Sequence, residues 1–291
     1  MPTVQLDDRA LVLVTDDDAE TLLQNIITTD ISSLKTGEVK PGALLAPQGK
    51  ILFDFLVSRV DTGFRLDCRA DVADDLVKRL TLYRLRAKAK INKQDQALVA
   101  VSWGDDSRSS PSDSASSRNE SSLLDTRFPE VDVSRHYGKT AGGSDRAEWD
   151  ALRAAHGIAE SGADYELGDA FPHDVLLDQT GGVGLAKGCY VGQEVVSRMQ
   201  HRGTARRRVL IATGPAALPA PGTEILANGR PLGALGTVAG RTGLAIVRID
   251  RVKDAMAAGN PITADGLELE LAIPSWAKFT FPADAASAEG A

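Results

Sequence analysis

Five short apolar segments follow one another in the last third of the chain, and glycine or proline separates them. They are residues 209–213, 223–227, 232–239, 244–249 and 267–273. Strands of this length with regular turn residues are typical of small antiparallel barrels and sandwiches. We therefore expect residues 206–280 to form a C-terminal β-barrel domain, followed by a flexible tail at residues 281–291.

The first hundred residues mix strand and helix patterns. Residues 10–14, 43–47, 51–60 and 64–68 read as strands, and Gln48-Gly49-Lys50 reads as the turn of a hairpin. A helix is expected after Thr15 as N-cap, because apolar residues from Ala19 to Ile27 repeat with helical spacing. We expect residues 1–103 to form an N-terminal α+β domain.

A serine-rich segment interrupts this pattern. Residues 104–122 contain nine serines in nineteen positions and few apolar side chains. A segment of this composition buries too little apolar surface to fold, so we expect a disordered insertion. Order is expected to resume in a middle α+β segment, residues 123–205, with a helix near 145–156.

Composition narrows the class of protein. The chain is 43% hydrophobic and 25% charged, with a net charge of −7, as in ordinary globular proteins. No apolar run approaches the roughly 18–20 residues of a membrane span, and acids stand where a signal peptide carries a basic head. The two cysteines are far apart and the four histidines have no metal-site spacing. We expect a reduced cytoplasmic protein without membrane contact or a metal held by its side chains alone.

Two stretches without acids concentrate the positive charge. Seven cations lie between Asp75 and Asp95, and strict alternation would place four of them on one strand face: Arg84, Arg86, Lys88 and Lys90. A second stretch, residues 195–223, holds five arginines from Arg198 to Arg208. These cations either form solvated faces or bind carboxylates or phosphates of an anionic ligand. Aromatic residues make up only 5% of the chain, so we do not expect direct nucleic-acid binding.

The principal site candidate is the segment Lys187-Gly188-Cys189-Tyr190-Val191-Gly192-Gln193-Glu194. The spacing of the apolar residues after Gly192 predicts a helix, so Cys189 would lie just before its N-terminus. There the helix dipole and Lys187 would both favour a thiolate. The alternative is an inert buried cysteine, which we expect of Cys68. Gln193 and Glu194 either cap the helix or hydrogen-bond a planar heterocycle.

These eight residues resemble the YgfZ/GcvT-like folate-binding family, and in particular its iron–sulfur branch of bacterial YgfZ-type proteins and mitochondrial relatives. The resemblance extends to residues 23–30, 48–50, 85–88 and 125–127. It implies an α+β, three-domain, aminomethyltransferase (GcvT)-like fold around a tetrahydrofolate pocket, with the β-barrel as third domain. It also implies a role in iron–sulfur cluster assembly or repair, including the clusters of tRNA-modifying enzymes.

The resemblance assigns roles to individual residues. Cys189, with Lys187 beside it, would be a redox-active or transiently cluster-binding thiol. Contacts to the folate would come from Asp54, Tyr190, Gln193 and Glu194, with Arg86 or Arg198 on the glutamate carboxylates. In the glycine-cleavage aminomethyltransferase an acidic pair follows a Gly-Gly turn, whereas this chain has Lys50, Phe53 and only Asp54. That departure argues against aminomethyl transfer.

Three functions therefore stay open. The leading one is a tetrahydrofolate-binding assembly factor whose partners are iron–sulfur assembly proteins or client iron–sulfur enzymes. The first alternative is a folate-dependent aminomethyltransferase or demethylase, which would turn over a methylated amine. The second is a tRNA-binding module, whose affinity would fall steeply with salt.

Overall fold

The computed structural model describes residues 1–104, 122–138 and 143–282. Most of the predicted serine-rich insertion and the end of the predicted tail lie outside these residues. The chain divides into two compact units. The first comprises Met1–Trp149, Leu167–Pro172 and Leu177–His201, and the second comprises Asp150–Glu166, His173–Leu176 and Arg202–Ala291.

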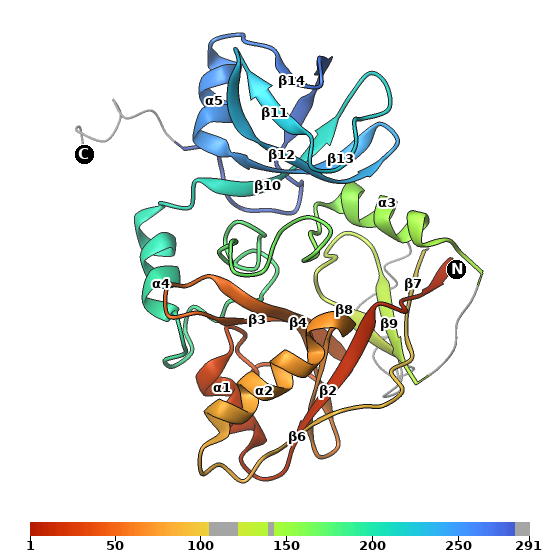
Figure 1. Ribbon diagram of the computed structural model, residues 1–291, viewed down its shortest axis with the longest axis vertical. Helices are drawn as coiled ribbons and strands as arrows, with labels where there is room; N and C mark the ends of the chain where they lie inside the picture. Colours follow the sequence, from red (N-terminus) through yellow and green to blue (C-terminus); the bar gives the residue numbers. More distant parts are fainter. Residues whose placement is uncertain (105–121, 139–142, 283–291) are drawn as a thin grey trace. The chain divides into compact units, whose positions relative to one another are not determined.

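The first unit is built on one nine-stranded sheet of order β1-β7-β9-β8-β3-β4-β5-β2-β6 (Figure 1). Its neighbouring strands are antiparallel except for the parallel pair β3 and β8. The strands are β1 (Thr3–Gln5), β2 (Arg9–Thr15), β3 (Glu38–Leu45), β4 (Ile51–Val60), β5 (Gly63–Arg69), β6 (Lys90–Lys93), β7 (Val99–Trp103), β8 (Ser122–Asp125) and β9 (Val133–Tyr137). The sheet is thus continuous across the serine-rich segment.

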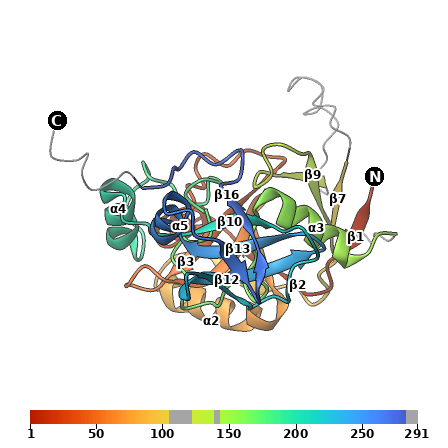
Figure 2. The same cartoon turned by 90° about the horizontal axis from the view of Figure 1, so that it is seen from above.

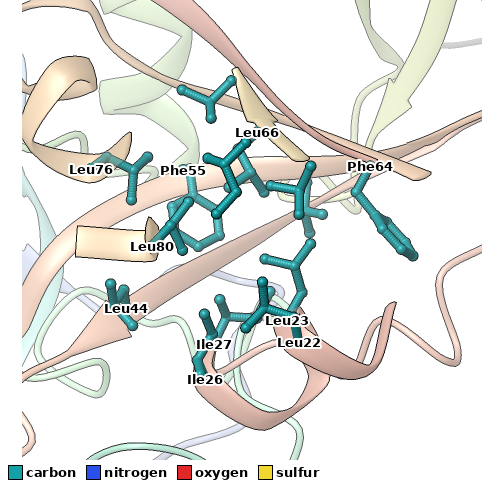
Figure 3. Close-up of a cluster of buried hydrophobic side chains, with 14 of the residues drawn as sticks. Leu22, Leu23, Ile26, Ile27, Leu44, Phe55, Phe64, Leu66, Leu76 and Leu80 are labelled. Carbon is teal, nitrogen blue, oxygen red and sulfur yellow. The ribbon is translucent and has the colours of Figure 1, made fainter. Parts of the chain in front are cut away.

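Two helices, α1 (Ala19–Ile26) and α2 (Ala73–Arg84), pack with this sheet, and the short 3-10 helix η1 (Ala70–Val72) leads into α2. Side chains of both helices converge with those of β3, β4 and β5, as Figure 3 shows. The predicted stripe of α1 is confirmed by buried Leu22, Leu23 and Ile26. Thr15 is not its N-cap: β2 runs through Thr15, Asp16 turns the chain at φ 78°, and Asp18 precedes the helix.

The predicted hairpin is confirmed as β3 and β4, with Gly49 at φ +81° in its turn. Alternation along β4 sends Phe53, Phe55 and Val57 into the core that α1 and α2 cover. Asp54 therefore lies on the other face of the sheet, half-buried and directly opposite Ala43 of β3.

The predicted basic strand at residues 84–90 is wrong. Helix α2 continues to Arg84, a turn closes where Ala87 N donates to Arg84 O at 2.7 Å, and only Lys90–Lys93 forms β6. Burial of Ala73, Leu76 and Leu80 stabilises the helix, and alanine and lysine have little strand preference of their own.

The segment then packs against the start of α1. Lys88 N donates to Asp18 Oδ2 at 2.6 Å, and Lys90 forms an ion pair with Asp16 at 3.2 Å.

A buried ionic network joins the two halves of the nine-stranded sheet. Asp67 of β5 accepts from Arg9 at 2.6 Å and from Arg135 of β9 at 2.7 Å, and Arg135 also contacts Asp125 at 3.4 Å. Burial raises the pKa of Asp125, but Arg127 and Arg135 outweigh it and hold that pKa below its ordinary value. Removing one partner would leave a buried charge without compensation, which is strongly destabilising.

The second unit carries an antiparallel seven-stranded sheet of order β15-β14-β11-β12-β13-β10-β16. Figure 2 shows β10, β13 and β12 side by side. The C-terminal antiparallel β domain is thereby confirmed. Helix α5 (Ile249–Ala257) and strand β14 (Ile262–Ala264) were not predicted. The other strands are β10 (Arg207–Thr213), β11 (Glu224–Ala227), β12 (Arg230–Ala239), β13 (Thr242–Arg248), β15 (Leu267–Glu268) and β16 (Glu270–Ala272).

Two further helices are α3 (Arg146–His156), close to its predicted position, and α4 (Gln193–Arg202). Trp149 of α3 is fully buried in the first unit and contacts Trp103 and Phe128, with ring centroids 5.9 and 5.5 Å apart. In the described part of the chain, no helix is long and apolar enough to cross a membrane.

Candidate functional site

The loop that carries Cys189 is fixed to the end of α1. Gly184 N donates to Thr28 O at 2.8 Å, and Thr28 Oγ1 donates to Gly182 O at 2.6 Å. Thr28 Oγ1 also accepts from Ala43 N of β3 at 2.9 Å, and the threonine is fully buried. One side chain thus links the loop, the end of α1 and the hairpin.

Lys187 makes the second attachment. Its Nζ donates to Ile27 O at 2.7 Å and to Thr29 O at 2.9 Å, and lies 5.2 Å from the centre of the Tyr190 ring. Burial lowers the pKa of Lys187 to about 8, although the charge of Asp30 opposes that shift. Because the ammonium group of Lys187 binds two backbone carbonyl oxygens, it holds the loop against the end of α1.

Two glycines make the third attachment, between the start of α4 and the hairpin turn. Gly192 has φ +80°, and a Cβ placed there would lie 2.6 Å from Ala46 O. A Cβ on Gly49 would lie 2.8 Å from Cβ of Val195. Only residues without side chains allow this close approach of two backbones.

Cys189 lies between these attachments and is exposed. Helix α4 begins at Gln193, four residues later, so Cys189 is outside the first turn over which a helix dipole acts. Cys189 thus lies farther from the helix N-terminus than the sequence predicted, with Tyr190, Val191 and Gly192 between them. Gly192, with its left-handed backbone, separates the cysteine from the helix.

The second cysteine behaves as predicted. Cys68 on β5 is fully buried, and burial raises the pKa of its thiol to about 12. It belongs to the core of the first unit. Cys189 is therefore the accessible thiol of this chain.

The remaining motif residues occupy different environments. Tyr190 is buried, which raises the pKa of its hydroxyl to about 12, and its carbonyl accepts from Gln193 N at 3.2 Å. Glu194 and Arg198 form an i,i+4 ion pair of 2.6 Å on the exposed side of α4. Tyr190 is thus buried and Gln193 half-buried, whereas Glu194 and Arg198 are exposed.

Asp54 and Arg86 are not brought together. In the sheet, β4 and β6 are three strand positions apart, roughly 14 Å at the usual strand spacing. Arg86 lies in the turn between α2 and β6, whereas Asp54 lies on the sheet face away from α1 and α2. The structure gives no support to one pocket that contains both residues.

Residues that were not assigned a role hold the loop in place. Thr28, Thr29 and Asp30 lie within the segment 23–30, which carried the family resemblance but no expected function. Asp30 accepts from Ser32 Oγ at 2.6 Å and from Gln24 Nε2 at 2.8 Å, and these hydrogen bonds lower its pKa.

Lys50, in the turn of the hairpin, contacts an aromatic ring: its Nζ lies 3.9 Å from the centre of the Phe171 ring. Among the described residues, no group of three or more His, Cys, Asp or Glu is suited to hold a metal ion.

The chain is similar to several known proteins. Residues 206–279 match the family described as CAF17, C-terminal beta-barrel domain. The chain is 32% identical over 238 residues to the mitochondrial iron–sulfur cluster assembly factor IBA57 homolog of Chaetomium globosum, covering 71% of this chain and 54% of that protein. It is 26% identical over 302 residues to human mitochondrial IBA57, covering 94% and 84%. The chain spans about half the length of several fungal relatives that it matches.

Among solved structures, the glycine cleavage system aminomethyltransferase T from Bartonella henselae matches with a TM-score of 0.68 and 15% identity, over 94% of this chain and 85% of that one. The predicted aminomethyltransferase-like α+β fold is confirmed. The predicted cytoplasmic location is wrong, because the similar relatives are mitochondrial proteins by name. Reduced cysteines indicate reducing surroundings and do not distinguish one such compartment from another.

Proposed function

We propose that the protein acts in iron–sulfur cluster assembly and that Cys189 is the thiol that contacts the cluster. The observation that carries this proposal is the placement of an exposed cysteine on a loop attached at both ends to the hairpin and the end of α1. A thiol held in this way approaches a partner with little loss of conformational freedom. The names of the similar relatives, which are iron–sulfur cluster assembly factors, support it.

The cysteine count defines what a partner must supply. A [2Fe–2S] or [4Fe–4S] cluster ordinarily takes four thiolate ligands. The chain has two cysteines and one of them is buried in the core. Cys189 would therefore provide one ligand, and an assembly protein or client enzyme would provide the others. The resemblance of the Lys187–Glu194 segment extends the clients to enzymes that modify tRNA.

We also propose that the sheet face of Asp54 binds a reduced folate. A half-buried carboxylate accepts hydrogen bonds from N–H groups of a pterin, and Asp54 lies on the face that α1 and α2 do not cover. When bound, a reduced folate supplies one-carbon or reducing chemistry. Arg198 would exchange its exposed partner Glu194 for a glutamate carboxylate of the folate. Arg86 has no part in this site.

The cluster proposal is tested in cells that lack their own copy of the protein. Wild type and Cys68→Ala should restore the activity of iron–sulfur enzymes, whereas Cys189→Ser should not. An enzyme without a cluster, assayed in the same extracts, controls for general growth defects. Full restoration by Cys189→Ser at equal protein level would remove the proposed role of this thiol.

A one-carbon transferase is the second candidate, favoured by the position of Asp54 on the sheet face that α1 and α2 do not cover. The acid that would complete a pair is replaced by Phe53, which packs against the core. Turnover of a methylated amine by purified protein with tetrahydrofolate, abolished by Asp54→Asn, would establish this activity. The absence of turnover under folate-saturating conditions would leave cluster assembly as the proposed function.

A further inference from the structure

The C-terminal end of α2 exposes two leucines. Leu82 is 69% exposed and Leu85 is 87% exposed. The opposite side of α2 buries Ala73, Leu76 and Leu80, and Figure 3 shows Leu76 and Leu80 directed into the core. Leu85 follows the last residue of α2, so both exposed leucines lie at the C-terminal end of this helix. Neither of these two leucine side chains is therefore buried by the packing of the first unit.

Leu85 is also held in an unusual backbone conformation. Its φ of 44° and ψ of −105° lie close to the first central position of a type II′ turn, where glycine is preferred. The hydrogen bond from Ala87 N to Arg84 O closes the turn. A leucine here is strained and gains no burial within the unit. Such combinations are concentrated where a surface has a function.

The cations of residues 78–93 differ in their partners. Lys78, Lys90 and Lys93 form ion pairs with Asp75, Asp16 and Asp74. The exposed side chains of Arg79, Arg86 and Lys88 form no ion pair with any residue that the structure describes. These three residues together with Leu82 and Leu85 are called the α2 tip below. It combines apolar anchors with available positive charge.

We propose that the α2 tip binds an acidic segment of a partner protein whose apolar side chains cover Leu82 and Leu85. Exposed leucine and arginine together suit a protein partner, since arginine provides charge-assisted hydrogen bonds to carboxylates and leucine buries apolar surface. Single-stranded nucleic acid would call for exposed aromatic rings on which bases stack. Segments that bind anionic membranes ordinarily carry clusters of roughly four to eight lysines and arginines, whereas the α2 tip has three such cations. This surface adds a docking site to the proposed cluster site.

The test uses a short fluorescent peptide, helical and amphipathic, composed of leucine, alanine and glutamate. Two matched peptides replace its glutamates by glutamine or its leucines by serine. Fluorescence anisotropy with the full chain should show binding of the first peptide and binding at least about tenfold weaker for the other two, about 1.4 kcal/mol. Only the first peptide offers both chemistries of the tip.

Variants of the chain assign the binding to this surface. Leu82→Ser with Leu85→Gly should weaken binding at least about tenfold while the melting temperature does not fall, because glycine suits the turn. Arg79→Gln with Arg86→Gln should also weaken it and reduce its salt dependence. Met256→Ser and Arg230→Gln, at an exposed methionine and an exposed arginine elsewhere, are matched controls that should bind as wild type.

Equal binding by the leucine variant and the wild type would overturn the proposal. So would tip-dependent binding of phosphatidylserine vesicles or single-stranded RNA in preference to the peptide, since the tip would then serve a membrane or a nucleic acid. Failure of the wild type to bind the peptide at millimolar concentration would also overturn it.

Discussion

The side-chain nitrogen of Lys187 lies 2.7 Å from the carbonyl oxygen of Ile27, the C-cap residue of α1. The last carbonyls of a helix have no partner within the helix, and positive charge is favourable there. Lys187 therefore caps a helix from a position 160 residues later in the chain. Because Cys189 is only two residues away, the same contact fixes the position of the exposed thiol.

Lys187 gives a pH-dependent prediction. Burial lowers its folded-state pKa to about 8, from 10.5. Between these values the unfolded chain holds more protons on this group than the folded chain, so its contribution to stability rises with pH. The free energy of unfolding of wild type minus that of Lys187→Met, measured with urea, should grow from pH 7.5 to 9.5.

The control for this prediction is Lys78→Met. Hydrogen bonding and the charge of Asp75 raise the pKa of exposed Lys78. Because its folded-state pKa lies above the ordinary value of 10.5, Lys78 is protonated in both the folded and the unfolded chain below that pH. The difference in unfolding free energy between wild type and Lys78→Met should therefore stay constant from pH 7.5 to 9.5. A flat difference for Lys187→Met as well would contradict the buried, carbonyl-bound ammonium.

The two glycines that flank Cys189 should respond differently to alanine. Gly192→Ala forces a side chain into a left-handed backbone and toward Ala46 O, so we expect a loss of about 1–3 kcal/mol in unfolding free energy. Gly188 has open space around the position of a Cβ, so Gly188→Ala should change stability by less than about 0.5 kcal/mol. Urea unfolding of both variants measures this, and equal losses would show that the loop is not docked through Gly192.

Local patterns predicted the parts of the fold that local physics determines. The strand-like segment at residues 51–60 and the turn signal at Gly49 identified the hairpin, because β4 is buried over residues 55–58 and a left-handed glycine closes the turn. The stripe of α1 was equally clear. Alternation failed at residues 84–90, where alternating cations imitate a strand but the buried stripe of α2 continues to Leu80.

The site was predictable only in part. The Lys187–Glu194 segment is visible in the sequence, but its supports at Thr28 and Thr29 are more than 150 residues away and carry no recognisable chemistry. The sequence did not give the separation between Cys189 and α4. Gly192 has a left-handed backbone, so the helix begins only at Gln193. Helix α5 was missed because its nine residues follow β13 directly, without a separating turn.

Folate binding should depend on Asp54 and not on Arg86. Loss of a charged hydrogen-bond acceptor in Asp54→Asn should weaken tetrahydrofolate binding about tenfold or more, equally for mono- and triglutamyl forms. Arg86→Ala should bind both forms as wild type does, because the turn after α2 lies three strand positions from β4. Isothermal titration calorimetry decides between them. If Arg86→Ala lost affinity for triglutamyl folate alone, Arg86 would contact the glutamate tail and this prediction would be wrong.

Anaerobic cluster reconstitution tests the role of Cys189 most directly. Wild type, Cys68→Ala and Cys189→Ser are incubated with ferric iron, sulfide and excess glutathione to supply the remaining thiolates, and protein-bound cluster is followed by visible circular dichroism. Because Cys68 is buried in the core and Cys189 is exposed, wild type and Cys68→Ala should give the same cluster signal and Cys189→Ser should give none. A cluster signal of wild-type intensity in Cys189→Ser would contradict the assignment of this thiol as the cluster ligand.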